Sequence, residues 1–322
     1  MDITIKSLYE ENEKELSFSL LGDKVGFNKK IKDKVISRPG LAFAGYCEGF
    51  GEYRLQVLGN VEINFLSSED ESEIIINARK FFKLSKPPCL IVSRNNVVPD
   101  FFLKTCNEAK IPILSSPVDT NELYAVLLDY LEDKFAPCEV IHGTLVDVYG
   151  IGILLTGRSG IGKSEIALDL VERGHRLVAD DAVELKREKG SVLIGKPREI
   201  LRHYLEIRGL GIIDVMNIFG IRAVRIQKRV EIEVRLEDHK DIVEYDRTGL
   251  KTEYSEMLGV KIPIIRLPIF PGKNITVISE AIALNYLLRI YGYNPAEELN
   301  KRLIQKLDYQ IKLKKILKGD TE

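Results

Sequence analysis

Short apolar runs alternate with longer amphipathic stretches through residues 1–134 of the chain. Short apolar runs between turn formers are typical of buried strands, whereas apolar positions three and four apart indicate one face of a helix. We predict strands at Arg54–Leu58, Cys89–Val92 and Ile111–Leu114, and helices at Ser72–Phe82, Pro99–Lys110 and Asp119–Lys134. Strands and helices that alternate at these lengths predict a small parallel α/β domain.

The second half of the chain carries a longer series of predicted strands. Thr144–Val148 and the apolar run from Ile151 flank Tyr149-Gly150, which predicts a hairpin. Further strands are predicted at Arg176–Ala179, Val183–Lys186, Ser191–Ile194, Val230–Leu236 and Val260–Ile269, and helices at Glu280–Tyr291 and Pro295–Lys315. We interpret Phe135-Ala136-Pro137 as a linker, so that residues 1–134 form an N-terminal α/β domain and residues 135–322 a second domain.

The last predicted helix has one apolar and one basic side. Seven Lys or Arg residues lie between Lys301 and Lys318. Such a basic side is usually a solvated helix face, and the alternative is a docking surface for an acidic protein.

A glycine-rich segment separates the strand that starts at Ile151 from a helix pattern that ends near Gly174. It reads Gly157, Arg158, Ser159, Gly160, Ile161, Gly162, Lys163 and Ser164, which is a complete G-x-x-x-x-G-K-S motif. Glycines let the backbone wrap a phosphate, and the positive end of the following helix attracts the same anion. In such a motif Lys163 reaches the outer phosphates and the Ser164 hydroxyl binds Mg²⁺. A chance glycine-rich turn is the alternative, and the strand before and the helix after it favour nucleotide binding.

Composition narrows the class of protein. The net charge of −1 gives no general attraction to nucleic acid or to an anionic membrane. No apolar run approaches the length of about 20 residues that a membrane span needs, and the acidic N-terminus is not a signal peptide. The four cysteines lack C-x-x-C spacing, which favours reduced core thiols over a disulfide or zinc framework. We therefore expect a cytoplasmic protein that binds neither nucleic acid nor membrane.

Three other features are candidates for chemistry. The pair Asp180-Asp181 ends an apolar strand. A carboxylate at this position holds Mg²⁺ or takes a proton, and the alternative is that the pair is only the polar end of the strand. His142 precedes the hairpin and is either a site residue or a structural histidine. The segment 204–220 places Glu206, Arg208 and Asp214 among glycines and apolar residues, which favours a site over an ordinary helix start or turn.

A phosphate loop does not by itself name the reaction. A GTPase needs an Asn-Lys-x-Asp signature, and Asn28-Lys29-Lys30-Ile31 lacks the aspartate. A nucleotide-gated regulatory binding module is the other alternative, and the neutral net charge argues mildly against one that acts on DNA. A kinase or phosphotransferase fits the residues best.

Several strings give the chain a specific resemblance to HPr kinase/phosphorylase, the bacterial family that phosphorylates a serine of the phosphocarrier protein HPr. The strings are His142–Tyr149-Gly150 (HGTLVDVYG), Gly157–Ser164, Gly174–Asp181 (GHRLVADD), Leu205–Ile213 (LEIRGLGII), Tyr245-Asp246-Arg247, Ile36–Ala42 (ISRPGLA) and Gln56–Asn60 (QVLGN). Because the strings occur in both halves, the resemblance covers nearly the whole chain, and LEIRGLGII is highly specific.

The resemblance implies a small N-terminal α/β domain and a C-terminal P-loop kinase domain similar to the nucleotide core of phosphoenolpyruvate carboxykinase. It implies a homohexamer that uses ATP or pyrophosphate with Mg²⁺. It also implies a reverse reaction, in which inorganic phosphate attacks phosphoserine-HPr and releases pyrophosphate.

Site roles are likewise implied by the resemblance. Lys163 clamps the phosphates, Ser164 and Glu206 hold Mg²⁺, Asp181 exchanges the serine proton, and His142 and Arg247 complete the site. The segment that serves both directions consists of Leu205, Glu206, Ile207, Arg208, Gly209, Leu210, Gly211, Ile212, Ile213 and Asp214.

One segment departs from the family pattern Pro-x-Arg-Pro-Gly-Arg-Asn, which the resemblance links to dephosphorylation. Here it reads Pro268, Ile269, Phe270, Pro271, Gly272, Lys273 and Asn274. Arginine grips phosphate with a planar fork of donors, whereas phenylalanine has no donor and lysine offers a point charge. We therefore expect a kinase with a weak reverse reaction. The alternative is that Phe270 faces the core and Lys273 suffices.

Overall fold

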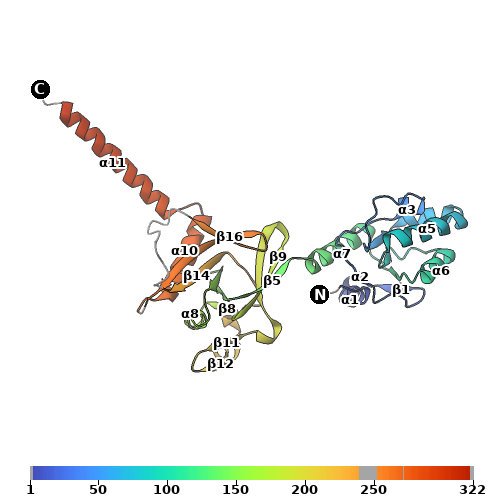
Figure 1. Ribbon diagram of the computed structural model, residues 1–322, viewed down its shortest axis with the longest axis horizontal. Coiled ribbons are helices and arrows are strands. Elements are labelled where there is room, and N and C mark those ends of the chain that lie inside the picture. Colours follow the sequence, from blue (N-terminus) through green and yellow to red (C-terminus); the bar gives the residue numbers. More distant parts are fainter. Residues whose placement is uncertain (1–2, 239–251, 271, 320–322) are drawn as a thin grey trace. The chain divides into compact units, whose positions relative to one another are not determined.

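The computed structural model describes residues 3–238, 252–270 and 272–319. The chain divides between Phe135 and Ala136 into two compact units, one residue beyond the boundary expected from the sequence. Each unit mixes helices and strands, as Figure 1 shows. Arg247 and Pro271, both predicted as site residues, lie outside the described residues.

The first unit is built on a four-stranded sheet with the order β1-β4-β3-β2. Its strands are β1 (Ser19–Leu21), β2 (Gln56–Leu58), β3 (Leu90–Val92) and β4 (Ile113–Ser115). The predicted parallel pairing is confirmed for β2 with β3 and for β3 with β4, whereas β1 pairs antiparallel with β4. The last three strands are buried along their whole length. The alternation of apolar and polar residues in Arg54–Leu58 predicts a half-buried strand, and this is wrong for β2, where Gln56 is buried as well because helices cover both faces of the sheet.

Helices pack on both faces of this sheet. They are α1 (Ile5–Glu11), α2 (Glu13–Leu16), α3 (Gly40–Phe43), α4 (Asn60–Ser68), α5 (Glu71–Ser85), α6 (Asp100–Glu108) and α7 (Thr120–Lys134). One core holds apolar residues of α3 to α6, and a second holds those of α1, α2 and α7. The side chains of Asp70 and Asp119 accept backbone N–H groups at the starts of α5 and α7, which fixes where these two predicted helices begin.

The second unit contains a six-stranded sheet with the order β15-β16-β14-β7-β6-β8. Its strands are β6 (Thr144–Val148), β7 (Ile151–Thr156), β8 (Arg176–Ala179), β14 (Ile232–Asp238), β15 (Glu253–Met257) and β16 (Val260–Ile269). The predicted hairpin is confirmed, because β6 and β7 pair antiparallel on either side of Tyr149-Gly150. Strands β7, β14 and β16 are parallel, and β8 has the direction of β7 because both pair antiparallel with β6.

This order of strands brings distant segments to one edge of the sheet. The carboxyl ends of β7, β8, β14 and β16 all lie there, together with the first residue of β6. We call it the loop edge, because the segment Gly157–Gly162 leaves β7 there. In open sheets of this kind ligands bind outside the carboxyl ends of the parallel strands.

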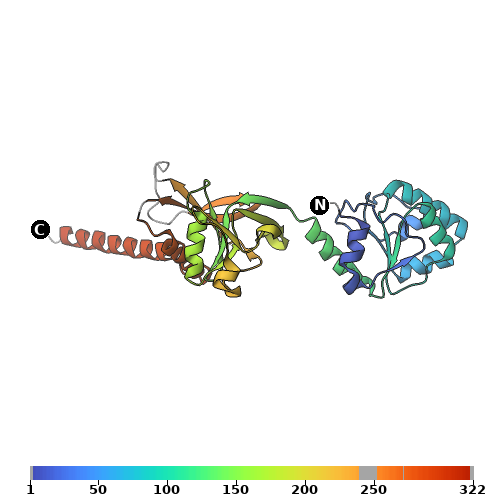
Figure 2. The same ribbon diagram turned by 90° about the horizontal axis from the view of Figure 1, so that it is seen from below.

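Two layers cover the six-stranded sheet. Helices α8 (Lys163–Glu172) and α10 (Ile275–Ile290) share a core with one face, and Figure 2 shows α8 lying along that face. A second core joins β6, β7 and β8 to a smaller sheet of order β13-β10-β9-β5. Its strands are β5 (Cys138–His142), β9 (Ala182–Glu188), β10 (Val192–Pro197) and β13 (Lys228–Arg229).

The remaining elements include two that differ from the expected ones. In the segment 204–220, β11 (Tyr204–Ile207) and β12 (Gly211–Asp214) form a hairpin that was not predicted, and helix α9 (Val215–Phe219) begins directly after Asp214. Helix α10 begins at Ile275, five residues before the predicted start, because the Asn274 side chain accepts the N–H of Val277. Helix α11 spans Pro295–Gly319, and short 3₁₀ turns lie at Lys189–Ser191, Glu199–Leu201 and Ile221–Ala223.

Candidate active site

The glycine-rich segment forms a tight loop between β7 and α8. Gly157, Gly160 and Gly162 have φ angles of 139°, 75° and 104°, which side chains rarely permit. A Cβ atom on Gly157 would also lie 2.6 Å from the carbonyl oxygen of Leu236 in β14, so the loop rests directly on the neighbouring strand. The glycines of the motif are therefore required by the backbone path and not only by its spacing.

Lys163 opens α8 and turns its ammonium group back onto the loop. Its Nζ donates to the carbonyl oxygens of Gly157 and Arg158, each at 3.1 Å, and lies 3.2 Å from Nε2 of His142. The residue is 6% exposed, and burial lowers its pKa while the carboxylates of Asp180 and Asp181 oppose that shift. A cation in this position faces whatever anion the loop encloses.

Asp180 lies at the centre of the polar groups on the loop edge. It accepts the Ser164 hydroxyl at 3.0 and 2.9 Å, the Thr144 hydroxyl at 2.6 Å and the backbone N–H of Glu206 at 3.3 Å. The residue is 4% exposed, and burial raises its pKa although these hydrogen bonds favour the charged form. The end of β8 is thus joined to β6, α8 and the β11–β12 hairpin.

Asp181 has a different environment from its neighbour. Its φ of 63° lies in the left-handed region, so that the chain turns sharply after Asp180. The side chain of Asp181 is 59% exposed, and its Oδ1 lies 3.0 Å from Nδ1 of His142. If Nδ1 carries the proton, Nε2 can accept a hydrogen bond from Lys163, which gives a polar chain from Lys163 through His142 to Asp181.

The β11–β12 hairpin places the specific LEIRGLGII string beside the loop. Leu205 is fully buried in the core, whereas the side chain of Glu206 is exposed. The Arg208 guanidinium covers Gly160, where an added Cβ would lie 2.2 Å from Nη2. Asp214 accepts the N–H of Asn217 and so caps α9. The predicted segment therefore divides into core, loop contacts and a helix cap.

The segment after β16 also lies at the loop edge. Phe270 is 44% exposed, so the alternative in which it faces the core is wrong. The Lys273 ammonium lies 5.6 Å above the Phe270 ring and 3.4 Å from the carbonyl oxygen of Pro268. Phe270 therefore reaches solvent at the edge where the predicted catalytic residues meet.

Comparisons with known proteins identify the family of the chain. The family model for the HPr Serine kinase N terminus matches residues 3–131, and that for the HPr Serine kinase C-terminal domain matches residues 133–303. The chain belongs to the HPr serine kinase family. The resemblance inferred from the sequence strings is thereby confirmed, and nothing in these comparisons supports a GTPase or a purely regulatory binding module.

Relatives in this family cover most of the chain. The HPr kinase/phosphorylase of Chloroherpeton thalassium is 47% identical over 310 residues, covering 95% of this chain and 90% of the relative. That of Prosthecochloris aestuarii is 44% identical over 324 residues, covering 99% and 94%. A solved structure of the Hpr(Ser) kinase/phosphatase from Coxiella burnetii is 34% identical and covers 50% of this chain and 98% of that one, with a TM-score of 0.45.

Two contacts at this family site were not foreseen from the sequence. Thr144 is fully buried, and its hydroxyl donates to Oδ1 of Asp180 at 2.6 Å. Arg158 of the loop forms an ion pair with Asp238 at the end of β14, with 2.6 Å between Nη2 and Oδ2. Pairs this far apart in sequence are not visible in a motif search. The position of Asp180 was the one sign in the sequence that it belongs to the site, because a carboxylate at the end of an apolar strand suits either metal binding or proton transfer.

The oxygen ligands at the loop edge suit Mg²⁺. This ion usually takes one or two carboxylates, several waters and the phosphates of its substrate. Within residues 3–238, 252–270 and 272–319, no three His, Cys, Asp or Glu side chains form a metal cluster. The Asp180 carboxylate and Ser164 hydroxyl nevertheless offer adjacent oxygens, as a shared metal–nucleotide site requires.

None of the described helices has both the length and the apolar character of a membrane span.

Proposed function

We propose that this chain transfers the γ-phosphoryl group of ATP to a serine of HPr, and that it also catalyses the reverse phosphorolysis. Membership of the HPr serine kinase family supports this reaction. We assign the reaction to the loop edge because Lys163, Asp180 and Asp181 meet there. Phosphoryl transfer depends mainly on positioning and on charge stabilisation, and this edge supplies both.

The segment Gly157–Ser164 acts as a P-loop in this proposal. Its backbone and Lys163 hold the β- and γ-phosphates, and the Arg208 guanidinium over Gly160 adds positive charge beside them. Ser164, Asp180 and Glu206 would hold Mg²⁺, which when bound neutralises charge on the phosphates. The backbone N–H of Glu206 already bonds to Asp180, which keeps this residue beside the proposed metal site.

Asp181 acts as the base in the kinase direction. The serine oxygen attacks the γ-phosphorus, the bond to the ADP oxygen breaks, and the serine proton passes to Asp181. Asp181 suits this role better than Asp180, because its carboxylate is exposed whereas that of Asp180 is buried and already accepts four hydrogen bonds. His142 holds Asp181 in place, and Arg247 is proposed to complete the site.

The reverse reaction uses the same groups. An oxygen of inorganic phosphate attacks the phosphorus of phosphoserine-HPr, the bond to the serine oxygen breaks, and that oxygen takes the proton from Asp181. Pyrophosphate is the other product. Pro268–Lys273 would position the second anion, and Phe270 gives no donor there, so we propose that this direction is weak.

The further properties implied by the resemblance are also part of the proposal. They are a kinase domain similar to the nucleotide core of phosphoenolpyruvate carboxykinase, use of pyrophosphate as an alternative donor, and a cytoplasmic homohexamer. Light scattering of the full chain tests the hexamer.

The reaction itself is tested with labelled ATP, Mg²⁺ and HPr, followed by detection of phosphoserine. Transfer to HPr that requires both the metal and the serine supports the proposal. Nucleotide binding without transfer would overturn it in favour of a binding module, and a strong preference for GTP would revive the GTPase alternative.

A further inference from the structure

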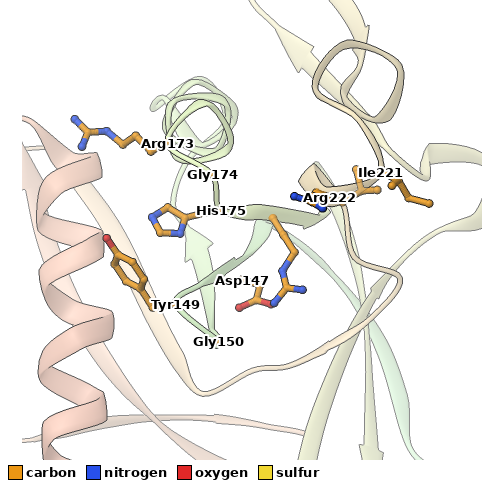
Figure 3. Close-up of a pocket in the computed structure, with 10 residues that line it drawn as sticks. Asp147, Tyr149, Gly150, Arg173, Gly174, His175, Ile221 and Arg222 are labelled. Atoms are coloured by element: carbon orange, nitrogen blue, oxygen red, sulfur yellow. The ribbon is translucent and has the colours of Figure 1, made fainter.

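A second cavity lies at the edge of the six-stranded sheet opposite to the loop edge. It has a volume of about 490 Å³ and lies between the Tyr149-Gly150 turn, the residues that follow α8 and the 3₁₀ turn Ile221–Ala223 (Figure 3). Helix α8 has 10 residues and is therefore about 15 Å long, so the cavity and the phosphate loop are at opposite ends of it. The proposed kinase reaction uses none of the residues that line this cavity.

Asp147 brings an unsatisfied acceptor to the cavity. Its side chain is fully buried, and its Oδ2 accepts from Arg176 at 2.8 Å and from Arg225 at 2.6 Å. Its Oδ1 is also buried and has no hydrogen-bond partner among the described residues. A buried acceptor without a partner destabilises a fold by about 1–3 kcal/mol, so this oxygen suits a ligand that brings an N–H or O–H group.

Tyr149 places an aromatic ring at the rim. Its φ is 52° and that of Gly150 is 85°, which are values for a hairpin turn that normally carries Asn-Gly. A bulky residue is rare in this left-handed conformation, and such outliers gather at functional sites. The tyrosine is 51% exposed, and its ring meets the ring of His175 edge to face at 4.6 Å (Figure 3).

Positive charge lines the other side of the cavity. Arg222 has no hydrogen-bonding or ionic partner within the described parts of the chain, and Arg176 keeps 43% of its side chain exposed beside Asp147. Arg173, which also pairs with Glu280, lines the cavity as well, so that three guanidinium groups line it against one carboxylate. Guanidinium groups bind phosphate oxygens through paired N–H donors.

We propose that this cavity is a second nucleotide site, specific for a mononucleotide. The base stacks on Tyr149, one of its N–H groups donates to Oδ1 of Asp147, and the phosphate is bound by Arg222 and Arg176. The base thus meets an aromatic ring and a buried acceptor, and the phosphate meets two guanidinium groups. The inference does not rest on the proposed kinase reaction, since the two sites share no residue.

Titration of the full chain with fluorescently labelled AMP and GMP tests this site. Pyrophosphate and Mg²⁺ are present in excess to occupy the loop, and the titration is repeated with Lys163→Ala, which weakens the loop site independently. Saturable binding of at least one nucleotide under both conditions is expected. Its absence under both conditions overturns the proposal, whatever the kinase activity.

Two variants locate the binding. Tyr149→Asn restores a residue that suits the turn, so the melting temperature should be unchanged or higher, while loss of stacking should weaken binding about tenfold or more. Arg222→Gln should weaken it to a similar degree, and Tyr291→Asn and Arg198→Gln are matched controls elsewhere on the surface. Binding that survives both cavity variants overturns the assignment.

Equal competition by ribose 5-phosphate would also overturn the assignment, because it would show a phosphate site without base recognition.

Discussion

The Ser164 hydroxyl lies 3.0 Å from one carboxylate oxygen of Asp180 and 2.9 Å from the other. This contact joins the first turn of α8 to the end of β8, two segments that are 16 residues apart in sequence. The residue that follows the phosphate-loop lysine is thereby fixed to a buried carboxylate before any nucleotide arrives. Metal binding and proton transfer therefore depend on this geometry and on the different surroundings of Asp180 and Asp181.

Lys163→Ala should nearly abolish phosphoryl transfer to HPr. The substitution removes the ammonium group that donates to the loop carbonyls of Gly157 and Arg158, while α8 keeps a good helix former. Initial rates of phosphoserine formation should fall more than tenfold, which corresponds to about 1.4 kcal/mol of transition-state stabilisation. Lys196→Ala, on the surface of β10, is the control and should keep normal rates. A rate above a tenth of wild type for Lys163→Ala would refute the assignment of the loop.

Asp181→Asn and Asp180→Asn should affect different steps. Asparagine at position 181 keeps the shape but cannot take the serine proton, so transfer in both directions should fall by a factor on the order of 10² with nucleotide binding retained. Asparagine at position 180 should instead raise the Mg²⁺ concentration needed for half-maximal rate. Rates measured across a Mg²⁺ series separate the two effects. If the Asp181 variant recovers at high Mg²⁺, Asp181 is a metal ligand and Asp180 becomes the candidate base.

Asp180 should make the metal-free protein less stable as the pH rises. Burial raises its pKa in the folded chain above the ordinary value of 3.8, so the folded state holds this proton more tightly than the unfolded state. Stability from this group is therefore present at low pH and is lost as the pH rises through the folded pKa. Without metal, Asp180→Asn should melt above wild type at pH 7, and the difference should shrink as the pH falls toward 4.

Magnesium provides the control for that measurement. With nucleotide present, Mg²⁺ should raise the melting temperature of wild type and have little effect on Asp180→Asn, because ligand binding stabilises only the state that binds it. A wild-type protein that is more stable than Asp180→Asn at every pH would show that burial does not penalise this carboxylate.

Phe270→Arg should increase phosphorolysis of phosphoserine-HPr. The side chain is exposed at the loop edge beside Lys273, and an arginine there adds planar donors for a second phosphate. Pyrophosphate release in the presence of inorganic phosphate should rise several-fold, while the forward rate changes little. Tyr254→Arg, an exposed aromatic position on β15, is the matched control. Strong phosphorolysis by wild type that Phe270→Arg leaves unchanged would show that the missing arginine does not limit this direction.

The sequence predicted the elements that have a simple apolar pattern. Strand β16 and strand β8 have the predicted bounds, because each lies between clear turn signals. Strand β5 was missed, because its five residues alternate between exposed and partly buried positions and none of them is fully buried. The β11–β12 hairpin was not predicted either, because glycines and charges within a short apolar segment are also typical of turns.

The site was predicted only where its residues are neighbours in sequence. The loop needs no tertiary information, whereas the bond between Thr144 and Asp180 requires the pairing of β6 with β8 across 36 residues. Burial separates Asp180 from Asp181, and no local pattern distinguishes two adjacent carboxylates. The exposure of Phe270 likewise follows from where β16 ends and not from the residue type.

The hydrogen bonds within the phosphate loop also determine what a binding experiment measures. Lys163 is held by carbonyl oxygens and Ser164 by Asp180, so a nucleotide must displace these partners before it can use the same donors. Association is then an exchange of one set of charge-assisted bonds for another. The binding enthalpy should therefore be small for the number of contacts that form, and much of the affinity should come from the release of water.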